Sequence, residues 1–177
     1  MHKKLSSKLS KLSDKTEKLM NQLDGENLEI LQKKPDENSW SVIQILNHLM
    51  VSESSSLNYV KKKILGIDTV GKVGVSARAR MLAMNLAFNG KRKFKAPVYV
   101  DNPSNSDDLQ QIKERWRELR GDLNTFLEDF PDEYIEKVVY RHPISGRVST
   151  SQMIDFFIMH MRHHVHQVNR TLLQVKS

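Results

Sequence analysis

Four of the seven histidines in this chain lie within the stretch MIDFFIMHMRHHVHQVNR, which spans residues 153–170. A neutral imidazole is a common protein ligand for divalent metal ions. On a helix that turns by about 100° per residue, His160 and His164 lie about 40° apart on one face. Two imidazoles at this spacing can bind a single ion. A buried pair of this kind also occurs without a metal, because backbone groups or water can satisfy both rings.

A third histidine lies far away in the sequence, in the stretch WSVIQILNHLMVSE. His48 is flanked by large aliphatic residues, where an unpaired polar side chain would be costly. Ser52, Ser55 and Tyr59 fall within about 40° of the His48 direction if this stretch is a helix. The resulting polar stripe is either a hydrated seam in the core or the wall of a pocket that leads to a metal.

Other polar residues near these histidines are expected to support the site or to lie outside it. Gln167 shares the stripe of His160 and is expected to support a ligand or to pack between helices. His163 lies at the edge of the stripe and His166 points about 120° away, so both are expected to be exposed or to flank the ligands. His142, in the sequence HPISG, is expected to shape a turn or the rim of a pocket.

The acidic residues limit the chemistry of such a site. Glu53 projects about 140° from His48, so we expect a hydrogen bond or ion pair with a neighbouring helix instead of a metal bond. The chain lacks the Glu-x-x-His motifs of di-iron bundles, and Met161 replaces the glutamate of a His-Glu-x-x-His zinc site. With no acidic residue clearly on the metal-facing stripes, the sequence favours Lewis-acid activation of a bound nucleophile over protease-like hydrolysis.

The elements that must position the histidines are predicted to be helices. Each ligand-bearing helix begins with a capping box, Ser41 with Gln44 and Ser149 with Gln152. A hydrophobic staple accompanies each box, and the staple pairs are Trp40 with Ile45 and Val148 with Met153. These signals predict one helix from Ser41 to about residue 65 and another from Ser149 towards the C-terminus.

The remaining segments complete an all-α fold. A first helix is expected over residues 5–31, and another from residue 106 or 107 to the sequence FPDE. Residues 66–106 are expected to form a long crossover, with a short helix at VSARARMLAMNLAFN and an extended connection at GKRKFKAPVYVDNPSNS. The sequence YIEKVVYRHPISGRVS predicts a short extended segment and a turn. The predicted fold is a four-helix bundle with one long crossover that carries an extra short helix.

Composition narrows the class of protein further. The 177 residues suit one domain over residues 1–177, and there is no cysteine for disulfides, thiolate ligands or nucleophilic catalysis. No apolar run approaches the roughly 20 residues that span a bilayer, and the N-terminal sequence lacks the features of a secretory signal. We therefore expect a cytoplasmic protein with no membrane association.

A net charge of +7 raises the question of nucleic-acid binding. Much of the excess lies on one face of the predicted first helix, at Lys3, Lys4, Lys8, Lys11, Lys15 and Lys18. A solvated helix face explains this pattern better than a nucleic-acid site, since no recognition motif accompanies it.

Two stretches together, WSVIQILNHLMVSE and HPISGRVSTSQMIDFFIMHMRHHVHQVNR, resemble the DinB/YfiT-like metalloenzyme superfamily. Its hallmarks are a Trp-Ser helix start, a His-Leu on that helix and a C-terminal His-x3-His-x2-Gln. The resemblance implies a four-helix bundle in which His48, His160 and His164 bind one divalent ion, with zinc or nickel most usual. It also implies a homodimer, and no DNA chemistry.

The function expected from residues and resemblance together is that of a metal-dependent enzyme acting on a small-molecule substrate. It would be a hydrolase or a transferase that uses a low-molecular-weight thiol, as in the thiol-transferase branches of the family. The alternative is a non-catalytic bundle that binds a small ligand or partner, with a metal that is structural or absent.

Overall fold

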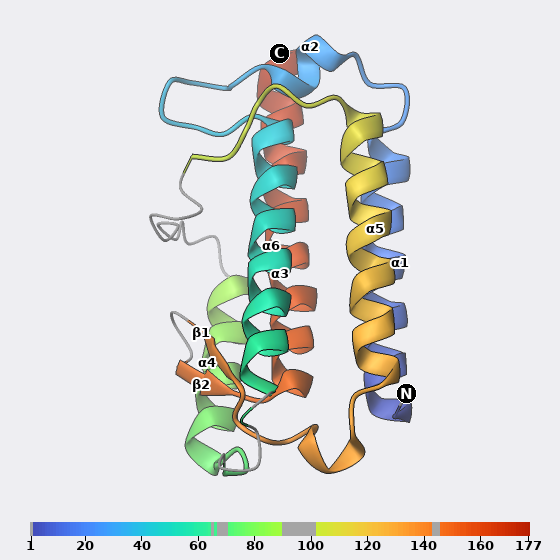
Figure 1. Cartoon of the computed structure of the whole chain (residues 1–177). Coiled ribbons are helices and arrows are strands. Elements are labelled where there is room, and N and C mark those ends of the chain that lie inside the picture. Colours follow the sequence, from blue (N-terminus) through green and yellow to red (C-terminus); the bar gives the residue numbers. More distant parts are fainter. Residues whose placement is uncertain (1, 65, 67–70, 90–101, 143–145) are drawn as a thin grey trace.

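Four long helices form the body of the molecule and lie side by side along one axis (Figure 1). The structure is a computed structural model that describes residues 2–64, 66, 71–89, 102–142 and 146–177. The long helices are α1 (Lys3–Leu23), α3 (Val42–Lys63), α5 (Leu109–Glu128) and α6 (Thr150–Lys176). Contacts of α6 with α1 and α3, and of α5 with α1 and α3, close the bundle. The predicted all-α four-helix bundle is confirmed.

The helices that carry the histidines begin where the sequence predicts. The Ser41 hydroxyl accepts from the Gln44 N–H at 3.1 Å, and the Gln44 side chain accepts from the Ser41 N–H at 3.2 Å. Ser149 and Gln152 form the same reciprocal pair at the start of α6, at 3.3 and 3.1 Å. Each box satisfies two backbone donors that would otherwise lack partners, so the starting residue of each helix is well defined.

The expected first helix is divided in two. α1 ends at Leu23, and a separate short helix, α2 (Leu28–Gln32), follows after a turn. Gly25 adopts a positive φ of 83°, a conformation that favours glycine and cannot continue a right-handed helix. The side chain of Asn27 then caps α2 by accepting from the Glu29 N–H at 2.9 Å. The prediction of one continuous helix over residues 5–31 was therefore wrong.

The connection between α3 and α5 is the predicted crossover. Both helices run in the same direction, so the chain must return along the bundle between them (Figure 1). The expected extra helix is present as α4 (Val75–Asn89), which packs on α6. Most of the extended connection expected next, residues 90–101, lies outside the described residues. α5 begins two to three residues later than predicted, because Asp108 forms a further capping box with Gln111.

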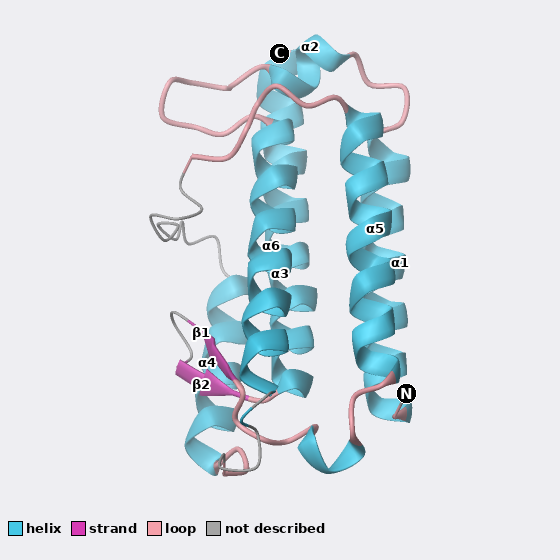
Figure 2. Ribbon diagram, in the orientation of Figure 1, coloured by secondary structure: helices cyan, strands magenta, loops and turns pink. Residues whose placement is uncertain are grey.

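A β-hairpin precedes α6 and packs beside α3 and α4 (Figure 2). It consists of β1 (Tyr140–His142) and β2 (Gly146–Val148), which pair antiparallel. The sequence predicted only an extended segment and a turn here, and the turn itself, residues 143–145, lies outside the described residues. The register places Tyr140 opposite Val148, Arg141 opposite Arg147 and His142 opposite Gly146.

Packing of apolar helix faces fills the centre of the bundle. Trp116 of α5 and Phe157 of α6 are among the largest fully buried side chains, and α1 contributes a leucine at nearly every turn. No helix within the described ranges has the length and apolar character needed to cross a membrane.

Candidate metal centre

The packing of α3 against α6 brings the three predicted ligands into one cluster. The Nε2 atom of His160 lies 3.1 Å from Nε2 of His48 and 3.0 Å from Nε2 of His164. All three side chains are buried. Their ligand atoms form a group that could hold a metal ion, with every pair within 4.8 Å. Ring nitrogens from residues that are more than a hundred positions apart in the sequence thus meet in the core.

Gln167 fixes the orientation of one ring in the cluster. Its side-chain oxygen lies 2.7 Å from Nδ1 of His164. An amide oxygen only accepts hydrogen bonds, so Nδ1 carries the proton and Nε2 of His164 presents a lone pair to the cluster. A hydrogen bond of this kind on the outer nitrogen is typical of metal-binding histidines. The expectation that Gln167 supports a ligand is consistent with this contact.

The spacing of the nitrogens fits a cation at their centre. Bonds of 2.0–2.1 Å from a tetrahedral zinc ion would separate its nitrogen ligands by about 3.3 Å, within a few tenths of the observed distances. Without an ion, His160 Nε2 faces two other ring nitrogens, and one N–H can point well at only one of them. His160 Nδ1 also lacks a hydrogen-bond partner among the described residues. A divalent ion would satisfy all three inward nitrogens at once.

Burial keeps His160 and His164 in the protonation state that binds metal. Removal from water lowers the pKa of His160 well below the usual 6.5, and the neighbouring His164 and His48 lower it further. Burial likewise lowers the pKa of His164, followed by the effects of His48 and His163, against the opposing hydrogen bond to Gln167. Only a neutral imidazole has the free lone pair that a metal requires.

Aromatic rings from separate segments surround the imidazoles. Trp40, just before α3, lies 4.8 Å from the His48 ring between centroids. Phe156 stacks on His160 at 4.9 Å with an angle of 20° between the rings, and Phe88 of α4 lies 6.1 Å from the same ring. These contacts hold the rings in place and make the shell around the site apolar, which limits access of water.

The carboxylate on α3 that lies nearest to His48 in the sequence pairs with another helix. The Glu53 carboxylate accepts hydrogen bonds from both terminal nitrogens of Arg120 on α5. The Glu53 side chain in this ion pair is 1 % exposed. The prediction that Glu53 pairs with a neighbouring helix is confirmed. Among the residues that the structure describes, no carboxylate oxygen joins the histidine cluster. The described site therefore offers imidazole ligands without an adjacent acidic base.

His163 and His166 flank the cluster or lie in solvent, as predicted, whereas His142, expected in a turn or at the rim of a pocket, is a buried strand residue. His163 is half-buried, and its Nδ1 lies 3.3 Å from the Phe88 carbonyl oxygen, while His166 is exposed. His142 lies on β1, at the edge of the turn, and its ring meets Phe156 edge-on at 4.2 Å. The ring of Phe156 thus contacts both His142 and His160.

The predicted polar stripe on α3 is not in the core. Ser55 and Tyr59 are exposed and Ser52 is only half-buried. The buried serine is Ser56, whose hydroxyl hydrogen-bonds the Tyr140 hydroxyl at 2.7 Å. The hairpin packs against α3 at this point, so it buries the neighbouring helical position instead of the one in line with His48.

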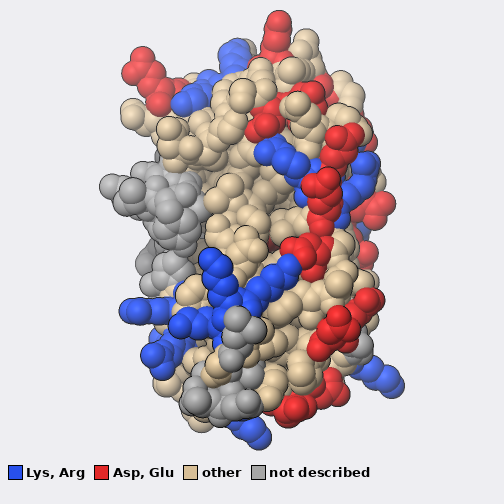
Figure 3. All heavy atoms as spheres, viewed as in Figure 1, with Lys and Arg blue, Asp and Glu red and all other residues tan. Residues whose placement is uncertain are grey.

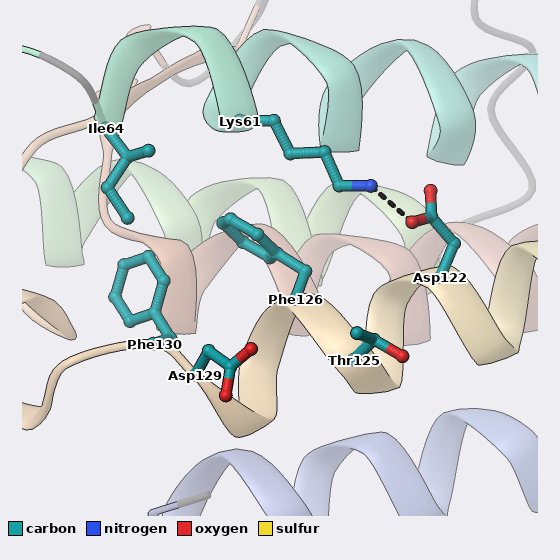
Figure 4. Close-up of a pocket in the computed structure, with 7 residues that line it drawn as sticks. All are labelled: Lys61, Ile64, Asp122, Thr125, Phe126, Asp129 and Phe130. Atoms are coloured by element: carbon teal, nitrogen blue, oxygen red, sulfur yellow. Dashed lines mark hydrogen bonds and ion pairs between the residues drawn. The ribbon is translucent and has the colours of Figure 1, made fainter.

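A surface pocket between α3 and α5 is separate from the histidine cluster (Figure 4). Ile64, Phe126 and Phe130 form its apolar wall. Lys61 and Asp122 also line it, but they bind each other across its edge (Figure 4). Its charged groups are thus exposed or paired, and it offers no buried nucleophile or base.

Sequence reasoning missed the aromatic wall of the site. Phe156 lies four residues before His160 on the same helix face, a signal that was present in the sequence. Phe88 gave no such signal, because its contact with His160 depends on how α4 docks on α6.

Comparison with known proteins identifies the family of the chain. The chain is similar to the uncharacterized protein YuaE of Bacillus subtilis (strain 168), with 24 % identity over 148 residues that cover 84 % of this chain and 86 % of YuaE. The profile of the DinB superfamily matches residues 8–168, nearly the whole bundle and all three clustered histidines. The resemblance inferred from the histidine motifs is confirmed, and the chain belongs to the DinB superfamily.

Proposed function

We propose that this protein is an enzyme that depends on one divalent metal ion bound by His48, His160 and His164. The observation that carries the proposal is the convergence of three buried histidines in the interior of the bundle, where the Nε2 atoms of His48 and His164 lie 3.1 and 3.0 Å from Nε2 of His160. Burying three imidazoles is costly unless their nitrogens are satisfied, and a metal ion satisfies them together. Zinc and nickel are the ions we favour, since both accept imidazole ligands.

Three neutral ligands would leave the ion with its full charge and an open position for water or substrate. When bound there, the ion would acidify a water molecule or hold a substrate thiol as its thiolate. The chain's own contribution is to orient His164 through Gln167, to fix His160 between aromatic rings and to limit the access of water.

The chemistry we favour is transfer of a low-molecular-weight thiol to a small electrophilic substrate, with metal-assisted hydrolysis as the second choice. The lack of a carboxylate beside the cluster, in the described part of the chain, supports this order. Hydrolysis usually needs a general base to take a proton from water, whereas a metal-bound thiolate is already a nucleophile.

Metal analysis of purified variants tests the ligand assignment. Alanine at position 48, 160 or 164 should abolish stoichiometric zinc or nickel, as measured by plasma mass spectrometry after equilibration with the ion. His166→Ala is the matched control, because its ring is exposed on the same helix, and it should keep the metal. Full occupancy in all three ligand variants would refute the assignment.

Because no carboxylate of the described residues joins the cluster, a second candidate is also supported, a non-catalytic bundle that binds a small ligand around a structural metal. A screen of electrophiles with thiols, and of esters and amides, separates the two. Turnover that requires both the metal and His160 supports the enzyme. Tight ligand binding without turnover in the metal-loaded protein supports the binding module.

We further propose that the protein acts as a cytoplasmic homodimer. On α4, Val75, Leu82 and Leu86 are 83 %, 60 % and 64 % exposed and lie on one face at helical spacing. An aliphatic stripe of this kind suits a contact with a second copy. Light scattering after size exclusion should give twice the chain mass, and Leu82→Asp should reduce it to one chain.

A further inference from the structure

The hairpin before α6 carries an unfavourable pair of charges. Arg141 and Arg147 are direct partners in the register of β1 and β2, and both are exposed. Opposite residues of an antiparallel pair project from the same face, with Cβ atoms about 4.5–5.5 Å apart. Like charges at this separation destabilise the pairing. The fold therefore retains two arginines at a position where an oppositely charged pair would be more stable.

A third arginine lies against the same hairpin. Gly146, the residue before Arg147, has a positive φ of 68°. A Cβ built on Gly146 would lie 3.7 Å from Nε and 3.8 Å from Nη2 of Arg80. The guanidinium of Arg80, which comes from α4, thus lies near the start of β2, on the side to which a side chain at position 146 would point. Successive residues of a strand point to opposite faces, so Arg80 is not on the face of Arg141 and Arg147. We call Arg141 and Arg147 together the arginine hairpin.

Negative charge near the arginine hairpin does not balance it. Neither Arg141 nor Arg147 forms an ion pair with an acidic residue in the described ranges. Figure 3 shows lysine and arginine side chains gathered over the hairpin and the adjacent end of α3, whereas acidic side chains gather over α5. The C-terminal turn of α3 adds Lys62 and Lys63, both exposed.

A solvated basic face would explain scattered lysines, but it gives no reason for two arginines in direct opposition. Guanidinium groups bind phosphate oxygens in a bidentate manner, and a phosphate dianion can neutralise two of them. We propose that the arginine hairpin is a binding site for a small molecule that bears a phosphate monoester or diphosphate. The ligand would convert the repulsion between Arg141 and Arg147 into two charge-assisted contacts.

Titration with inorganic pyrophosphate tests the proposal directly. Calorimetry with the full chain at low salt should detect binding that weakens as salt is added. The double variant Arg141→Gln, Arg147→Gln should bind about tenfold more weakly or worse, given the strength of hydrogen bonds to charged groups. The control Lys11→Gln, Lys18→Gln removes the same charge from an exposed face of α1 and should bind like the wild type.

Three outcomes would overturn the proposal. Wild-type protein could fail to bind pyrophosphate at low salt, or the α1 control could lose as much affinity as the hairpin variant. Binding to anionic lipid vesicles or duplex DNA, with none to pyrophosphate, would show that the basic face serves a surface or a polyanion instead of a small ligand.

A charge reversal tests whether Arg141 and Arg147 repel each other, and it does so without relying on a loss of function. Arg141→Glu places opposite charges across the strands, so it should abolish pyrophosphate binding and raise Tm by up to about 3 °C. Arg141→Glu with Arg147→Glu restores like charges and should remove that rise. A melting temperature for Arg141→Glu no higher than wild type would show that the two charges do not oppose each other. None of these measurements depends on metal binding.

Discussion

The buried pair of Glu53 and Arg120 offers the sharpest test of how this bundle uses its charges. Arg120 donates to both carboxylate oxygens, and its Nη2 also donates to the Thr16 hydroxyl at 2.9 Å. The contacts join α1, α3 and α5. The side chains of Glu53 and Arg120 are only 1 % and 13 % exposed. Water can therefore do little to replace a lost partner.

Glu53→Gln should be strongly destabilising, because it leaves the guanidinium charge buried without a counter-ion. Breaking a buried pair in this way costs about 3–5 kcal/mol, whereas replacing both partners by apolar residues is often neutral or stabilising. For a chain of this size the single change should lower Tm by roughly 6–20 °C. The double variant Glu53→Met, Arg120→Met should be more stable than Glu53→Gln.

Urea unfolding followed by circular dichroism measures both changes, and metal content is measured on the same samples. Glu53→Gln should still bind zinc or nickel stoichiometrically, because its carboxylate points towards α5 and away from the histidine cluster. Loss of metal without loss of stability would show that Glu53 serves the metal centre. Equal stability of the single and double variants would refute the argument about an uncompensated buried charge.

Three further predictions concern the histidines. Burial lowers the pKa of His142 from 6.5 to about 4, so the unfolded chain takes up the proton first as pH falls. The contribution of neutral His142 to the free energy of unfolding should be complete above pH 6.5. At pH 4.5 it should be smaller by about 2.5 kcal/mol. In urea unfolding at both pH values, His142→Leu should lose this acid sensitivity, and His166→Leu should keep it. Gln167→Leu, which removes the acceptor for His164, should weaken zinc binding about 10–100-fold in competition with a chelating dye. Zinc at a hundredfold excess over its Kd should stabilise the protein by about 2.7 kcal/mol in a thermal melt, and His48→Ala should abolish most of this increase.

Local chemistry explains why much of the fold could be predicted from the sequence. The boxes Ser41–Gln44 and Ser149–Gln152 depend on residues three positions apart, and a helix of fixed pitch then sets the directions of all later side chains. The same fixed pitch placed His160 and His164 on one buried face and turned Glu53 towards another helix. Each of these features is determined within one element.

The predictions that failed depended on contacts between elements or on a single backbone conformation. The helical periodicity placed Ser55 on the same face as His48 and predicted that it is buried. The docking of β1 buries Ser56 instead, and helix pitch alone cannot resolve this difference of one position. The break in the first helix results from the positive φ of Gly25. An isolated glycine within a helical pattern is compatible with continuation, so the pattern did not indicate the break.

The position of the histidine cluster follows from how its two helices are anchored. Near the start of α3, Gln44 and Asn47 donate to the backbone oxygens of Pro103 and Ser104, so the end of the crossover is bound to the helix just before His48. The hairpin leads directly into the capping box of α6. Both helices are therefore fixed by contacts that do not involve the histidines. Because the metal ligands project from elements that are ordered independently of them, we expect the bundle to fold without metal. The cost of burying three imidazoles then remains in the metal-free protein, and it is offset when the ion binds.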